Sequence, residues 1–189
     1  MIRLFTALAL AAAAAGCGGG GAFGNSPDVT NPPAVSGQKL SFEYFQRCVY
    51  PVLTTALTVP GGGAQTCASS GCHDDRNGTG GAFRTVSGAA IVDLATTSTA
   101  TARASDMYKT FFSAMGSAVI GSPTASRMVN KPLVRGVLHG GGVIFAGDTD
   151  PNLRRIEYWI GKSTADEFSS ASAAMFTPPD PATGTCNTQ

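Results

Sequence analysis

Two cysteines and a histidine lie close together in this 189-residue chain: Cys67, Cys72 and His73. Cysteine thiols form thioether bonds to the vinyl groups of a porphyrin, and a histidine directly after the second cysteine is then held beneath the iron. The usual spacing leaves two residues between the cysteines, whereas this chain has four, including the small residues 69–71 that can bulge outward. The pattern predicts one covalent haem c, bound through Cys67 and Cys72, with His73 as an axial ligand of the iron.

The opposite axial position has few candidates, because the chain contains only 2 histidines. His139 precedes three glycines, Gly140–Gly142, whose small size lets an imidazole ring come close to a haem face. We therefore expect bis-histidine ligation by His73 and His139. Met128 is the first alternative, and a thioether ligand there would raise the reduction potential because it stabilises ferrous iron. The remaining alternatives are Met107, Met115 and a His139 that binds no metal.

Three other kinds of site use some of the same residues. A tetrahedral zinc site could take Cys67, Cys72, His73 and His139, but adjacent Cys72 and His73 are awkward ligands for one small ion. The sequence His-Gly-Gly-Gly at 139–142 also has the form of a lipase oxyanion loop, although the chain lacks the Gly-x-Ser-x-Gly motif of such hydrolases. A haem peroxidase or ligand sensor needs the same haem with an open sixth position, and this is the main enzymatic alternative.

The N-terminal residues have the features of an export signal. Arg3 precedes an apolar run, Leu4–Ala15, which is shorter than the ~20 residues of a membrane-spanning helix. The run ends in Ala14-Ala15-Gly16-Cys17, which resembles the lipobox of bacterial lipoproteins, and the resemblance implies a diacylated Cys17. Gly18 follows Cys17, and by the same resemblance this residue favours anchoring in the outer membrane. We expect a signal peptide at 1–16, lipid anchoring at Cys17 toward the periplasm or the exterior, and a flexible tether at 17–37.

Two of the 5 cysteines then have no role in haem attachment or lipidation: Cys48 and Cys186. An exported protein is in an oxidising compartment, where a remaining pair of cysteines tends to form a disulfide. We therefore expect a bond between Cys48 and Cys186, with two independent free thiols as the alternative. Such a bond would fasten a C-terminal tail at 166–189 to the first helix of a domain at 38–165.

Apolar residues at helical spacing predict three helices, at 42–53, 106–116 and 150–161. Each has a capping residue at its start, Ser41, Asp106 and Asp150 respectively, and the last two end at glycine. Pro51 interrupts the first helix because it lacks a backbone N–H. We also expect short helical segments at 88–94 and 126–131, and a loop at 96–101. The fold class that follows is all-α, with long Gly-rich loops and disordered termini.

These features together resemble the c-type cytochromes, in particular bacterial single-haem domains with a widened haem motif. The likeness includes the helical segment at 45–53, the Lys-Pro-Leu sequence at 131–133, the His-Gly-Gly-Gly sequence at 139–142 and Trp159-Ile160, and it covers Phe42 to Gly161. The resemblance implies a cytochrome c-like fold and electron transfer to and from redox partner proteins, rather than enzymatic catalysis.

The charge balance is close to neutral, with 13 basic and 12 acidic side chains. A protein that binds nucleic acid usually carries a marked excess of basic residues. We therefore expect no nucleic acid partner, and contact with the membrane through the lipid anchor alone. The same balance gives no long-range electrostatic indication of the redox partner.

Overall fold

The first helical segment runs from Phe42 to Thr54 and changes its pitch in the middle. In this computed structural model, which describes residues 39–189, it consists of α1 (Phe42–Tyr44), the π-helical η1 (Phe45–Val49) and α2 (Tyr50–Thr54). Ser41 caps it, because its Oγ accepts a hydrogen bond from the Tyr44 N–H. The N–H of Tyr50 donates to the Phe45 carbonyl, five residues back. This wider turn lies just before Pro51, where we expected an interruption.

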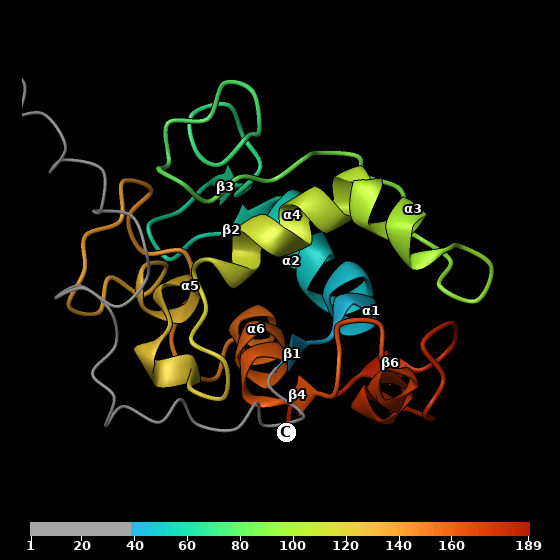
Figure 1. Cartoon of the computed structure of the whole chain (residues 1–189). Helices are drawn as coiled ribbons and strands as arrows, with labels where there is room; N and C mark the ends of the chain where they lie inside the picture. The colour runs from blue at the N-terminus through green and yellow to red at the C-terminus, as the bar shows by residue number, and fades with distance from the viewer. Residues whose placement is uncertain (1–38) are drawn as a thin grey trace, which may run out of the picture. The chain divides into compact units, whose positions relative to one another are not determined.

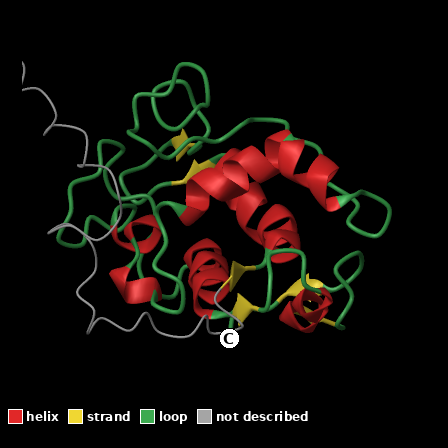
Figure 2. Ribbon diagram, viewed as in Figure 1, coloured by secondary structure: helices red, strands yellow, loops and turns green. Residues whose placement is uncertain are grey.

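The remaining elements are short helices and two-residue strands joined by long loops (Figures 1 and 2). The helices are α3 (Thr99–Ala104), α4 (Asp106–Met115), η2 (Pro123–Ala125), α5 (Arg127–Asn130), α6 (Pro151–Gly161) and η3 (Ser170–Met175). The strands are β1 (Lys39–Leu40), β2 (Leu57–Thr58), β3 (Ala64–Gln65), β4 (Ser163–Thr164), β5 (Phe176–Thr177) and β6 (Thr185–Cys186). None of the helices within residues 39–189 is long and apolar enough to cross a membrane.

The prediction of an all-α fold is wrong. The well-defined part of the chain contains about 35% helix and 9% strand, so the fold is mixed α/β. The strands form three antiparallel pairs, β1 with β4, β2 with β3, and β5 with β6. Each strand has only 2 residues, which is too short for the alternation of apolar and polar residues by which a strand is recognised in a sequence.

The longer helices follow their caps and apolar spacing. The predicted helix at 150–161 is confirmed as α6, whose first turn is capped by the Asp150 carboxylate. The predicted helix at 106–116 is confirmed as α4, although Ser105 rather than Asp106 caps it. The loop expected at 96–101 is partly wrong, because Ser98 caps α3 there.

An aromatic cluster connects the first helical segment with α4 and α6. The ring of Phe45 lies 5.1 Å from Trp159 and 5.4 Å from Phe111, between ring centroids, and all three side chains are fully buried. Trp159 also donates its indole N–H to the Ser41 carbonyl at 2.9 Å. The cluster buries a large aromatic area, and its indole N–H has a hydrogen-bond partner. It forms the centre of the core.

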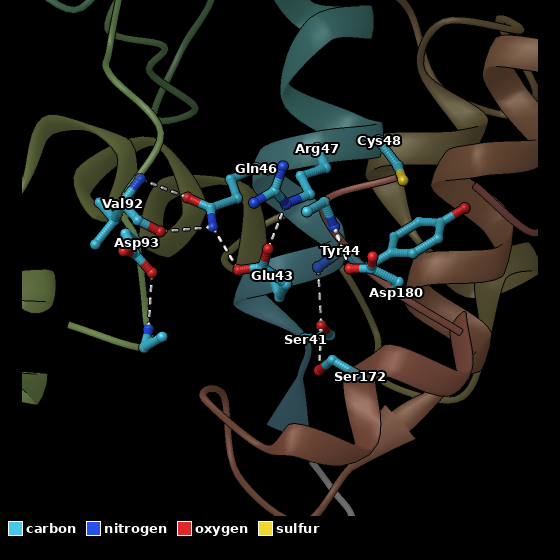
Figure 3. A network of polar contacts seen from close by, with 12 residues as sticks. Ser41, Glu43, Tyr44, Gln46, Arg47, Cys48, Val92, Asp93, Ser172 and Asp180 are labelled. Atoms are coloured by element: carbon cyan, nitrogen blue, oxygen red, sulfur yellow. Dashed lines mark hydrogen bonds and ion pairs between the residues drawn. The ribbon is translucent and has the colours of Figure 1, made fainter. Parts of the chain in front are cut away.

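Polar side chains of the first helical segment hold the chain at 86–92 against it. Both atoms of the Gln46 amide bond to the backbone of Val92, at 2.9 Å from the Val92 N–H and 3.0 Å to its carbonyl (Figure 3). Tyr50 donates its hydroxyl to the Val86 carbonyl and accepts from the Ala89 N–H, both at 2.8 Å. In a helix at 88–94 the Val92 N–H would donate to the Gly88 carbonyl, but Gln46 takes this donor. The predicted helix at 88–94 is wrong, since the segment is not helical.

The C-terminal residues 166–189 pack into the same compact unit as the rest of the described chain. The structure joins Cys48 to Cys186 in a disulfide, with their Cα atoms 5.9 Å apart. Ser41 donates its hydroxyl to Ser172 at 2.6 Å, and Phe176 is buried (Figure 3). The segment predicted as a tail therefore covers one end of the first helical segment.

Replacing both disulfide cysteines, Cys48→Ala with Cys186→Ala, should lower the free energy of unfolding by up to about 5 kcal/mol, because the bond closes a very long loop. The two residues are 138 positions apart. Denaturant unfolding followed by Trp159 fluorescence measures the change. A reducing agent should lower the unfolding midpoint of the unaltered protein and leave that of the double variant unchanged. Equal midpoints for the two oxidised proteins would contradict the prediction.

Candidate haem site

The β2–β3 pair returns the chain from the end of α2 to the start of the Cys67–His73 segment. Immediately after β3, Thr66 donates its hydroxyl to the Leu53 carbonyl at 3.1 Å, and the N–H of Ala68 donates to the same carbonyl at 3.0 Å. The Leu53 carbonyl lies in the last turn of α2, where a carbonyl has no N–H donor within the helix. These two bonds provide its partners. The strand pair that the sequence did not predict therefore positions the first cysteine against the core.

The segment between the two cysteines folds back on itself. The N–H of His73 donates to the Cys67 carbonyl at 2.8 Å, and the N–H of Cys72 donates to the Ser69 carbonyl at 2.9 Å. The backbone therefore returns to its starting point, and the intervening residues form a compact turn. This geometry accommodates the wide spacing between the cysteines in the way that the small residues suggested.

The ring of His73 is fixed by the loop that follows it. Its Nδ1 lies 3.1 Å from the Phe83 carbonyl, and its ring centroid lies 4.6 Å from that of Phe83. The backbone of Gly80 passes directly beside the ring, because a Cβ atom added there would lie 2.6 Å from His73 Nδ1. A side chain at Gly80 would displace the imidazole, so the sequence requires glycine at this position.

His139 is held in a similar way by its own loop. Its Nδ1 lies 2.8 Å from the Gly142 carbonyl, and the N–H of Gly142 donates to the His139 carbonyl at 2.9 Å. Gly142 has a φ of +69°, which glycine adopts without strain. The N–H of Ile144 then donates to the Pro132 carbonyl at 2.8 Å and fastens the end of the loop beside α5.

The two histidine rings lie 6.3 Å apart between centroids, and their planes differ by 10°. This separation is too large for direct stacking of the rings. When one metal ion lies between two imidazoles, each metal–nitrogen bond is about 2.0–2.1 Å long. With the distance from each nitrogen to its ring centre added, the two ring centroids are roughly 6 Å apart. The spacing therefore fits one metal ion held between His73 and His139.

The hydrogen bonds of both rings leave Nε2 available as a ligand. A carbonyl oxygen only accepts, so Nδ1 carries the proton in each ring and Nε2 keeps its lone pair in the neutral form. Within residues 39–189, neither Nε2 has a hydrogen-bond partner. Burial lowers the pKa of His73. The hydrogen bond to Phe83 acts in the opposite direction, and His139, Lys131 and Arg84 lower the pKa further. The neutral, ligating form of His73 is therefore favoured at neutral pH.

A cavity of about 230 Å³ separates the two loops and is open to solvent on one side. Cys67, His73, His139 and Met128 all contribute to its wall. The rest of the wall is largely apolar, and its apolar side chains are Leu53, Ala82, Phe83, Pro132, Ile144, Phe145 and Ile156. An apolar cavity with a few convergent polar groups is the usual form of a cofactor site.

The other sequence candidates lie in different surroundings. Cys72 is adjacent in sequence to His73 but is not part of the cavity wall, and its thiol is free, as is that of Cys67. Burial, and to a lesser degree the Cys72 thiol, raise the pKa of Cys67 to about 11. Met107 is fully buried in the core, and Met115 also lies outside the wall. Met128 is thus the methionine candidate that reaches the cavity.

Several residues of the site were not predicted from the sequence. The sequence does not predict the Phe83 carbonyl as the hydrogen-bond partner of His73. Arg127 and Lys131, which also contribute to the cavity wall, were not assigned to the site. Their spacing of four residues around Met128 would place them on the same side of a helical turn, but only the fold shows that this side faces the cavity.

The described residues do not provide a tetrahedral protein site for a metal ion. Within 39–189, no group of three or more His, Cys, Asp or Glu side chains lies close enough to hold one ion. A porphyrin supplies four nitrogen ligands itself, so the protein needs to supply only the axial pair. The pair His73 and His139 fits that requirement, whereas a structural zinc site normally takes four protein ligands. Cys17 lies outside the described residues.

Comparisons with protein-family models, with curated proteins and with solved structures found no match to this chain. The assignment of the site therefore depends on the geometry of its own residues.

Replacing Gly80 with alanine should displace the ring of His73, because the added Cβ would overlap the imidazole. Loss of burial should then raise the pKa of His73 toward its ordinary value. NMR titration of the two histidines in the haem-free protein measures this change. Gly71→Ala is the matched control, because a Cβ there meets no atom within 4 Å. An unchanged His73 pKa in Gly80→Ala would show that the glycine does not determine the position of the ring.

Proposed function

We propose that this chain is a single-haem electron-transfer protein of the c type. Cys67 and Cys72 would hold the haem through thioether bonds, and His73 and His139 would provide its two axial ligands. The observation that carries this proposal is the pair of nearly parallel imidazole rings, 6.3 Å apart, on the wall of an apolar cavity. A bound haem would supply a one-electron couple between ferrous and ferric iron.

The hydrogen bonds to Phe83 and Gly142 would tune this couple. A histidine that donates its second ring nitrogen to a carbonyl is oriented for ligation and becomes a more basic ligand. More basic axial ligands stabilise the more highly charged ferric state, which lowers the reduction potential. The apolar wall acts in the opposite direction, because burial disfavours the additional charge. The protein would thus set its potential through these two loops and the side chains between them.

Ligation by both histidines would favour electron transfer over the haem peroxidase or ligand sensor. Peroxide or a small gas molecule must bind iron directly, so those activities need one open axial position. The separation of the two rings, 6.3 Å between centroids, is close to that of two imidazoles on opposite sides of one metal ion and supports ligation by both. The His139 loop is held by backbone hydrogen bonds from the Gly142 N–H to the His139 carbonyl and from the Ile144 N–H to the Pro132 carbonyl. The redox partners are proposed to be other proteins that approach the haem edge.

The absorption spectrum of protein matured with the covalent haem-attachment machinery tests this proposal. We expect a mass increase of one haem and a low-spin spectrum, because two histidines give a strong axial field. His139→Ala should convert the spectrum to high spin by opening one axial position. Met128→Leu is the matched control, because Met128 also lies on the cavity wall, and it should remain low spin.

Each alternative predicts a different result in the same samples. If Met128 is the ligand, Met128→Leu becomes high spin and His139→Ala does not. A high-spin spectrum of the unaltered protein would support the peroxidase or sensor. Colourless protein that contains zinc and no added porphyrin mass would contradict the haem proposal entirely.

We also propose that the protein is a lipoprotein of the bacterial cell envelope, anchored through Cys17. Metabolic labelling with palmitate should label the full-length protein and fail to label Cys17→Ser, because the substitution removes the acylated thiol. The Cys48→Ala variant is the matched control, because it also removes one cysteine and should remain labelled. Absence of label from the unaltered protein would contradict lipid anchoring.

A further inference from the structure

Two cations lie on the same side of α5 and contribute to the wall of the cavity. Arg127 begins α5, and Lys131 is its C-terminal capping residue, four positions later. The N–H of Lys131 donates to the Arg127 carbonyl at 2.9 Å, so the two residues occupy consecutive turns on one side. Met128, between them, is buried and also reaches the cavity.

The backbone of α5 is held firmly beside the cavity. The N–H of Met128 donates to the Ser117 carbonyl at 2.9 Å, which ties α5 to the end of α4. Ser126, fully buried, accepts a hydrogen bond from the Val119 N–H and donates to the Ser122 carbonyl, both at 2.8 Å. The cations at 127 and 131 are therefore presented from a fixed turn of helix.

Neither cation has an acidic partner in the described part of the chain. The ion pairs formed by residues 39–189 involve other cations, namely Arg47, Arg103, Lys109 and Arg135. The cavity wall itself contains no aspartate or glutamate. Two positive charges without an ion-pair partner, the exposed Arg127 and the half-buried Lys131, lie at one side of a largely apolar cavity. They favour a ligand with an apolar body and two negative groups.

We propose that Arg127 and Lys131 bind the two propionate carboxylates of the haem. This inference rests on the proposed function, since it concerns the same cavity. Haem has a flat apolar body and two carboxylates along one edge, which matches the distribution of charge on the wall. The guanidinium of Arg127 has the fork of donors that binds a carboxylate in two places, and the Lys131 ammonium provides a compact charge. The pair thereby orients the haem within the cavity.

Reversible haem binding tests the assignment. In a Cys67→Ala, Cys72→Ala background, haem binds without thioether bonds, so its dissociation constant can be compared with that of haem dimethyl ester. The ester lacks the two negative charges of the haem propionates and otherwise resembles haem. With Arg127 and Lys131 present, haem should bind roughly tenfold or more tighter than the ester, as charge-assisted hydrogen bonds predict. The Arg127→Gln, Lys131→Gln variant should bind both about equally.

The matched control is Arg76→Gln with Lys162→Gln, which removes the same charge from two exposed residues outside the cavity wall. It should keep the preference for haem over the ester. An unchanged preference in the Arg127→Gln, Lys131→Gln variant would overturn the propionate assignment while leaving the haem site intact. Absence of a low-spin complex with either porphyrin would instead overturn the haem site, and the assignment with it.

A second measurement uses the covalent holoprotein, in which both cysteines are retained. Resonance Raman spectra contain propionate bending bands whose frequency depends on the hydrogen bonds to the carboxylates. Replacing Arg127 and Lys131 with glutamine should shift these bands, and the control pair Arg76 and Lys162 should not. Identical bands in all three proteins would contradict contact between the propionates and α5.

Discussion

The hydrogen bond from each histidine Nδ1 to a backbone carbonyl is the interaction on which the proposed site depends. His73 uses the Phe83 carbonyl, and His139 uses the Gly142 carbonyl. Both acceptors belong to loops rather than to helices, ten residues after His73 and three residues after His139. The orientation of each ring therefore follows from the path of the backbone downstream of it. The 6.3 Å separation of the rings is the combined result of these two local arrangements.

Loops of this kind keep a defined geometry only when the rest of the fold restrains them. The first helical segment provides much of that restraint. Its C-terminal carbonyl at Leu53 holds the start of the cysteine segment, and Gln46 and Tyr50 hold the chain that follows. The same segment contacts α4 and α6 through the aromatic cluster around Phe45. One short helical stretch therefore links the core to the wall of the cavity.

The sequence predicted the features whose information is local. Asp150 and Pro151 mark the start of α6 directly. The haem hypothesis likewise comes from a local pattern, the spacing of Cys67, Cys72 and His73, and it stays a prediction. Two pairs of distant residues, Cys48 with Cys186 and His73 with His139, were predicted because the chain has so few cysteines and histidines. Other features that need distant residues to meet were missed. The two-residue strands exist because separate parts of the chain pair briefly, and they leave no periodic pattern. Likewise, no local pattern shows that Gly80 passes beside His73, or that Arg127 and Lys131 face the cavity. The all-α expectation came from the resemblance to c-type cytochromes together with helical periodicity, and neither indicates strands of two residues.

The burial of Cys67 affects which of the four cysteines within residues 39–189 can take part in disulfide exchange. Disulfide exchange requires a thiolate, and a thiol with a pKa of about 11 is almost entirely protonated at neutral pH. Once folded, Cys67 is thus a poor nucleophile for disulfide exchange, while Cys48 and Cys186 are already joined in their own bond. Oxidative crosslinking would in this way stay separate from the proposed attachment of haem.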